Sequence, residues 1–174
     1  MKRRGALAFG VGLLASCATT APRAPSEIAG RLALRIEPPD APARAFAADF
    51  DLRGDAERGQ LRLAGPLGAT LAEARWQPGR AELTRPDAAP EAFDTLDALA
   101  LALLGEAVPL AALPDWLRGR PWTGARSVAR SGGFDQLDWS IDLAQLADGV
   151  IVATRARTPK LAALTVRVRL DRGD

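Results

Sequence analysis

The sequence reads GRLALRI over residues 30–36 and FAADFDL over residues 46–52. Apolar and polar side chains alternate in both stretches, so each predicts a β-strand with one apolar face and one polar face. The turn-forming residues Pro-Pro-Asp at 38–40 lie between them and favour an antiparallel hairpin. The apolar side chains that would share one face of this hairpin are Leu32, Leu34, Ile36, Phe46, Ala48, Phe50 and Leu52. Those expected on the opposite face are Arg35, Asp49 and Asp51.

The same alternation predicts further strands on both sides of a central interruption. The stretches before the interruption are 61–63, 70–76 and 81–83, and those after it are 137–143, 150–154 and 164–170. Leu63 and Trp76 would extend the inner apolar face. Residues 131–133, Ser-Gly-Gly, lack the lysine and the spacing of a phosphate-binding loop, so we interpret them as a hairpin turn.

The central interruption has helical spacing. Asp94 or Thr95 can cap a helix whose leucines stand at 96, 99, 103 and 104, and Gly105 would end it. A second short helix is expected over 110–118, before Gly119. Together with the strands, these helices predict a mainly β fold, an open and curled antiparallel sheet that the helices cover. Alternation alone does not distinguish a sheet face that lines a cavity from one that forms a packed core.

The N-terminus carries the features of a bacterial lipoprotein signal. Three basic residues at 2–4 precede the uncharged stretch 6–15, which is too short to span a bilayer. The residues Leu-Ala-Ser-Cys at 14–17 resemble a lipobox, in which the signal peptide is cut before the cysteine and the thiol is acylated. We therefore expect a signal peptide over 1–16, a tether over 17–27 anchored through Cys17, and one domain over 28–174. Ala18, in place of Asp, favours the periplasmic face of the outer membrane.

The composition disfavours most catalytic chemistry. The chain has no histidine and a single cysteine, so Ser-His-Asp and Cys-His catalysis and histidine-ligated metal sites are not expected. The acidic pairs Asp49 with Asp51 and Asp135 with Asp138 would lie on the solvated face of strands. Without Lys2, Arg3 and Arg4 the 23 basic residues fall to 20 against 21 acidic ones, which gives no basic surplus for nucleic acid. We expect no enzyme activity, metal, cofactor or nucleic-acid partner.

Three stretches behind the lipobox resemble a known family. The first reads RLAGPLGAT at 62–70 and WQPG at 76–79. The second comprises 94–105, VPL at 108–110 and LPDWLRGRP at 113–121, and the third reads GFDQLDW at 133–139 and leads into the last strands. In this order they resemble the LolB family of outer-membrane lipoprotein receptors, over nearly the whole chain after the signal peptide.

The resemblance implies an incomplete antiparallel β-barrel with short lid helices between the strands. Such a protein accepts lipoproteins from the periplasmic carrier LolA in an apolar cavity and inserts them into the inner leaflet of the outer membrane, without a nucleotide. Its partners would be LolA, the acyl chains of client lipoproteins and outer-membrane lipid, and we expect a monomer. The loop leucine that the family needs for membrane insertion falls on Leu67, which Gly65, Pro66 and Gly68 surround; the alternative is that it folds back onto the core.

The expected site residues fall into two further groups. Those expected to contact acyl chains are Leu34, Phe46, Phe50, Leu63, Trp76, Leu99, Leu103, Trp116 and Leu117. The last four belong to the predicted lid, where ordinary packing of helices on a sheet is an equal alternative. The basic residues expected to face the carrier at the rim are Arg118, Arg120 and Arg126. Two other classes stay open, a lipid-anchored scaffold of envelope assembly without a cavity and an envelope hydrolase, which the missing histidines disfavour.

Overall fold

The computed structural model describes residues 27–171, in which eleven strands form one antiparallel sheet. The strands are β1 (Glu27–Glu37), β2 (Arg44–Gly54), β3 (Gly59–Ala64), β4 (Thr70–Gln77), β5 (Arg80–Thr84), β6 (Glu91–Phe93), β7 (Ser127–Arg130), β8 (Gly133–Gln136), β9 (Trp139–Asp142), β10 (Val150–Arg155) and β11 (Ala163–Leu170). The helices are α1 (Leu96–Leu104), α2 (Leu113–Trp116) and a single 3₁₀ turn, η1 (Leu146–Asp148).

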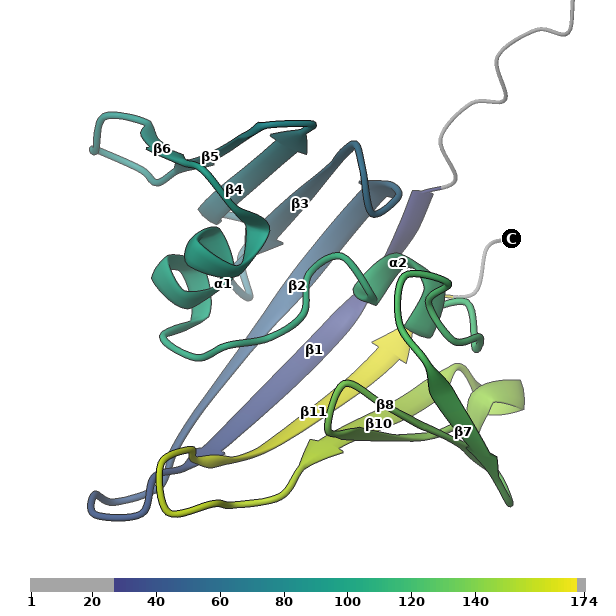
Figure 1. The fold of residues 1–174 in the computed structure, drawn as a ribbon. Helices are drawn as coiled ribbons and strands as arrows, with labels where there is room; N and C mark the ends of the chain where they lie inside the picture. Colours follow the sequence, from purple (N-terminus) through teal and green to yellow (C-terminus); the bar gives the residue numbers. More distant parts are fainter. Residues whose placement is uncertain (1–26, 172–174) are drawn as a thin grey trace, which may run out of the picture.

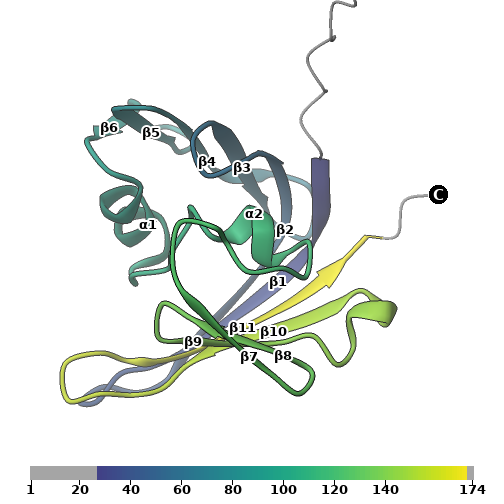
Figure 2. The same cartoon turned by 45° about the vertical axis from the view of Figure 1, so that its right-hand side comes forward.

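The sheet is a meander whose first and last strands pair at its centre. Its order is β6-β5-β4-β3-β2-β1-β11-β10-β9-β8-β7, so β1 lies between β2 and β11 (Figure 1). The edge strands β6 and β7 do not pair with each other, and the segment that connects them carries α1 and α2 across the inner side of the curved sheet (Figure 2). The prediction of an incomplete antiparallel barrel with short helices is therefore confirmed.

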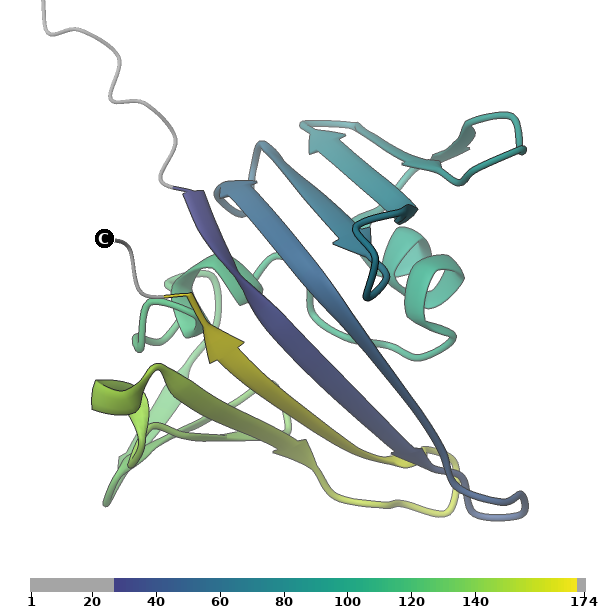
Figure 3. The ribbon, with the colours of Figure 1, turned by 180° about the vertical axis from the view of Figure 1, so that it is seen from behind.

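The outer face of the sheet lies away from the helices (Figure 3) and carries paired charged side chains. Arg31 pairs with Asp49 at 2.8 Å across β1 and β2, and Arg62 pairs with Asp51 at 3.3 Å across β3 and β2. The hydrogen bond from the Arg31 guanidinium holds the pKa of the Asp49 carboxyl below its ordinary value. These acids are thus paired on the outside of the sheet, as the alternation predicted.

Helix α1 follows its sequence signals. The Thr95 hydroxyl accepts a hydrogen bond from the Ala98 N–H at 3.1 Å, and Gly105 ends the helix with a φ of 71°. Thr95 is therefore the cap, of the two candidates. Leu99 and Ala100 are fully buried on the face that packs against β4, β5 and β6.

The second predicted helix is much shorter than expected. We expected a helix over 110–118, but α2 covers Leu113–Trp116 only. Pro114 has no N–H to donate to the carbonyl of Leu110, so residues before 113 form turns in place of a helix. Gly119, with a φ of 73°, lies shortly after the helix.

Two strand predictions in the second half were wrong. We expected one strand over 137–143, but Leu137 and Asp138 both adopt positive φ, 54° and 64°, and form the turn between β8 and β9. In β10 the alternation is shifted by one residue, so that Ile151, Ala153 and Arg155 lie in register with inward-facing residues of β9 and β11. Val152 and Thr154, whose alternation with Val150 predicted this strand, face outward instead, because a shift of one residue along a strand exchanges its two faces.

Candidate functional site

A small apolar cavity lies between the inner face of the sheet and the segment that crosses it. We call this segment, residues 104–117, the cover. The cavity has a volume of about 50 Å³, and all of its lining residues are Leu, Val or Phe. The lining residues from the sheet are Leu32, Leu34, Phe50, Leu52, Leu61, Leu63, Val166 and Val168. Those from the cover are Leu104, Val108, Leu110, Leu113 and Leu117.

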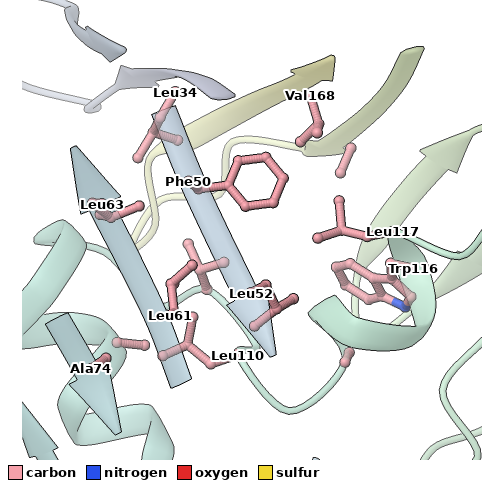
Figure 4. Close-up of a cluster of buried hydrophobic side chains, with 14 of the residues drawn as sticks. Leu34, Phe50, Leu52, Leu61, Leu63, Ala74, Leu110, Trp116, Leu117 and Val168 are labelled. Carbon is pink, nitrogen blue, oxygen red and sulfur yellow. The ribbon is translucent and has the colours of Figure 1, made fainter. Parts of the chain in front are cut away.

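Strand alternation and the short helix together aim these side chains at one another. Figure 4 shows the Phe50 ring extending from β2 toward Val168 of β11 and Leu117, next to α2. Leu110 approaches Leu61 from the side of the cover (Figure 4). Because the lining offers no charge or hydrogen-bond partner, the space suits hydrocarbon and disfavours a polar ligand.

Polar contacts tie both ends of the cover to the second half of the sheet. At its start, the buried Arg155 of β10 donates from Nη1 to the Ala107 carbonyl at 2.8 Å and lies 3.4 Å from a Glu106 carboxylate oxygen. At its end, the Trp116 indole N–H donates to the buried Gln136 side chain of β8 at 2.8 Å. The stretch between these ties reaches the sheet through the apolar side chains that line the cavity.

Gln136 makes a dense set of hydrogen bonds. Besides Trp116, its Oε1 accepts from the Trp122 N–H at 3.0 Å, and its Nε2 donates to the carbonyls of Trp122 and Ala125, both at 2.8 Å. The Trp116 ring also lies 6.0 Å from the ring of Trp139. These bonds hold α2 and the chain after it firmly against the edge of the sheet.

The turn between β3 and β4 exposes one large apolar side chain. Leu67 is 99% exposed, the highest value among the exposed large hydrophobic side chains of residues 27–171. The Gly65 N–H donates to the Ala69 carbonyl, and the Gly68 N–H donates to the Gly65 carbonyl, both at 2.9 Å. Gly68 has a φ of 78°, which a glycine adopts without strain. Leu67 therefore stands at the tip of a closed turn and does not fold back onto the core.

The expected acyl-contact residues occupy different places. Leu34, Phe50, Leu63 and Leu117 line the cavity. The remaining five, which pack elsewhere in the same apolar core, are Phe46, Trp76, Leu99, Leu103 and Trp116.

Trp76 shows why a residue on the inner face need not reach the cavity. Its indole N–H donates to the Asp55 carbonyl at 2.9 Å, next to the turn between β2 and β3. The cover leucines at 104, 110 and 113 and the valine at 108 were missed in the sequence. Leu104, Leu110 and Leu113 fall in the stretches predicted to be helical, but none of these four side chains was predicted to contact acyl chains.

The three arginines expected at the rim follow α2. Arg118 donates to the Pro114 carbonyl at 2.6 Å, and Arg120 forms an ion pair with Asp115 at 2.7 Å. Arg126 is exposed in the chain that leads to β7. Two of these side chains are therefore held around α2. Cys17 and the segments 1–26 lie outside the described residues.

Within residues 27–171, neither helix is long and apolar enough to cross a membrane, and no cluster of three acidic or cysteine side chains could hold a metal ion. The fold and the site define an open antiparallel half-barrel that encloses an apolar cavity under a helical cover and exposes a leucine on a neighbouring turn. Residues 26–172 match the family described as outer membrane lipoprotein LolB. The chain belongs to this family.

Relatives support the same assignment. Outer-membrane lipoprotein LolB of Bordetella petrii is 38% identical over 170 residues, which cover 87% of this chain and 85% of the relative. The protein of the same name from Bordetella pertussis is 36% identical over 123 residues, 67% of this chain and 62% of the relative. The one from Chromobacterium violaceum is 30% identical over 148 residues, 78% of this chain and 79% of the relative.

Proposed function

We propose that this chain is a lipid-anchored receptor that takes lipoproteins from the periplasmic carrier LolA and inserts them into the inner leaflet of the outer membrane. Family membership supports the transport role. The observation that carries the proposal is the cavity, whose lining is wholly Leu, Val and Phe and therefore matches acyl chains. A scaffold lipoprotein without a cavity is not favoured, since such a protein needs no space of this kind.

The size of the cavity requires the cover to move when a client is bound. Sites for small organic ligands usually measure roughly 300–1,000 Å³, whereas the cavity here measures about 50 Å³. The sheet face is fixed by its ladder of backbone hydrogen bonds, so the cover is the part that can lift. We expect residues 108–113 to move most, because polar contacts hold both ends of the cover.

Transfer needs no nucleotide in this proposal. The equilibrium favours transfer of a client from one apolar site to the next when the second site binds it more tightly than the first, and the bilayer is the final acceptor. The rim arginines Arg118, Arg120 and Arg126 would speed the first step by attracting an acidic surface of the carrier.

Anchoring and insertion use other parts of the chain. We propose that residues 1–16 are removed, that Cys17 carries the acyl chains, that 17–27 form the tether and that 28–174 form the working domain. Each buried methylene adds roughly 0.8 kcal/mol to membrane affinity, so several acyl chains give a lasting anchor. Leu67 would then enter the membrane interface from the exposed turn.

Adjacent residues of one strand give a matched test of the cavity. Phe50 lines the cavity, whereas its neighbour Asp49 faces outward and pairs with Arg31. Leu34 and the outward Arg35 form a second such pair in β1. A photo-crosslinking residue at Phe50 or Leu34 should capture a radiolabelled lipoprotein delivered by LolA, and one at Asp49 or Arg35 should not. Equal labelling of both members of each pair would contradict binding in the cavity.

The expected acyl-contact residues outside the closed cavity test, in the same experiment, whether the cover lifts. If the cover lifts as proposed, crosslinkers at Phe46 and Leu103, which are only partly buried, should also capture the client. Trp76, Leu99 and Trp116 are buried, so labelling at these positions would indicate that the binding space expands into the packed core.

A further inference from the structure

The turn that carries Leu67 has little packing to hold it in place. Apart from the two adjacent residues, nothing lies within 4 Å of the position that a Cβ atom at Gly68 would take. At Gly65 the nearest atom to that position is a methyl group of Leu71, at 3.7 Å. Leu67 itself is 99% exposed. The orientation of the turn therefore depends mainly on hydrogen bonds.

One arginine supplies two of these bonds. Arg62, on the outer face of β3, donates from Nη2 to the Gly68 carbonyl at 3.2 Å and from Nε to the Thr70 hydroxyl at 3.0 Å. Its Nη1 donates to the Asp51 carboxylate of β2 at 3.3 Å. A single planar guanidinium thus joins the turn to β4 and to β2, and a lysine could not reproduce this fork of donors.

The strand register explains why the turn needs a brace. Leu63 pairs with Ala72, but Ala64 pairs with Thr70, so Leu71 is an extra residue on β4 at the base of the turn. Such a bulge bends its strand and interrupts the ladder locally. The first residues of β4 are therefore less constrained by the sheet, and the Arg62 contact to Thr70 falls at this point.

We infer that Arg62 is a positioning residue for membrane insertion: it holds the turn so that Leu67 is presented to the lipid without a further loss of conformational freedom. This inference rests on the proposed role of Leu67. Ordering a mobile loop during binding consumes part of the favourable free energy, so an ordered turn engages the interface more strongly than a mobile one. Arg62 has no part in accepting the client, because its side chain lies on the outer face of the sheet.

The test compares Arg62→Gln with Arg75→Gln in the full lipidated chain. Arg75 is an outward arginine of the neighbouring strand β4 that pairs with Glu73 and lies toward the end of β4 that is remote from the turn. Acceptance of a lipoprotein from LolA and its insertion into phosphatidylethanolamine–phosphatidylglycerol vesicles are measured separately. Arg62→Gln should slow insertion about three- to tenfold, the effect of losing roughly one hydrogen bond, with normal acceptance, and Arg75→Gln should change neither. Equal effects of the two variants would overturn the inference.

A double-variant cycle separates a positioning role from a general structural one. If Arg62 acts through Leu67, then Arg62→Gln should slow insertion no further in a Leu67→Ala background. Hydrogen exchange should increase in the peptide covering 65–70 and stay unchanged elsewhere. Additive effects, or faster exchange across the whole sheet, would contradict the inference. Normal insertion by Leu67→Ala alone would refute the proposed role of Leu67, whereas slow insertion by Leu67→Ala with normal insertion by Arg62→Gln would refute only the role of Arg62.

Discussion

Replacing Leu67 by glutamate should separate acceptance of a lipoprotein from its insertion. The side chain is 99% exposed in the protein, so nearly all of its apolar surface remains available for burial in the membrane interface. Full burial of a leucine is worth about 1.5 to 3 kcal/mol, which corresponds to roughly tenfold to a hundredfold in membrane engagement. A carboxylate forfeits this gain and resists leaving water. We expect Leu67→Glu to insert lipoprotein into liposomes at least tenfold more slowly.

The same exposure predicts that the rest of the protein is unaffected. Leu67 contributes no packing to the core, so the free energy of unfolding should change by less than about 0.5 kcal/mol. Acceptance from LolA, measured with the labelled client before liposomes are added, should stay normal. Leu101→Glu is the matched control, because Leu101 is also an exposed leucine, on α1, at 55%. Insertion by Leu67→Glu at the normal rate would refute this reasoning, as would a joint loss of acceptance and thermal stability.

Other predictions concern the anchor, the rim, the core and the pH response. Cys17→Ala should abolish incorporation of radiolabelled palmitate, and label that still enters the variant would exclude lipidation at this residue. If the rim arginines steer the carrier, the rate of transfer from LolA should fall as salt is raised above about 0.1 M; a rate that is independent of salt would remove them from the proposal. Gln136→Leu leaves several buried partners without hydrogen bonds, at about 1 to 3 kcal/mol each, so its thermal unfolding midpoint should lie well below that of the unsubstituted chain; an unchanged midpoint would contradict the importance of this network. The backbone N–H groups of Arg58 and Glu57 lower the pKa of Asp55 from 3.8, so its stabilising effect is present above that pH and is lost as the pH falls through the lowered value. Asp55→Asn should therefore show a flatter acid dependence of the unfolding midpoint, and identical pH curves would exclude the effect.

Strand alternation predicted much of the first half of the sheet because each strand there has a single consistent phase. In β1 and β2 the residues Leu34 and Phe50 are buried while their neighbours Arg35 and Asp49 face outward. Water contact on one face and apolar contact on the other impose this pattern on the sequence. The cap at Thr95 was equally direct, since a hydroxyl before a helical run has a specific hydrogen-bonding role.

In the second half of the sheet, the same alternation gave wrong predictions for identifiable reasons. The sequence Val-Ile-Val at 150–152 is apolar at every position, so either phase fits, and the buried Arg155 is an unexpected residue for the inner face. The turn at Leu137 and Asp138 uses left-handed conformations that favour Asn and Gly, and neither residue occurs there. The cavity itself could not be predicted from the strand pattern, because packed and hollow interiors show the same alternation.

The small free energy gained by burying a single leucine also explains why insertion would need the lipid anchor. A binding free energy of about 1.5 to 3 kcal/mol corresponds to a dissociation constant weaker than millimolar. Leu67 alone therefore could not hold a protein from solution on a membrane. The ten peptide links from Cys17 to Glu27 can span at most about 33 to 36 Å, comparable with the diameter of a domain whose radius of gyration is about 15 Å. If Cys17 carries the acyl chains as proposed, a tether of this reach would keep the domain at high local concentration near the bilayer and still let it turn. Weak contact by the turn would then be sufficient to orient the domain for insertion and brief enough to release it for the next client.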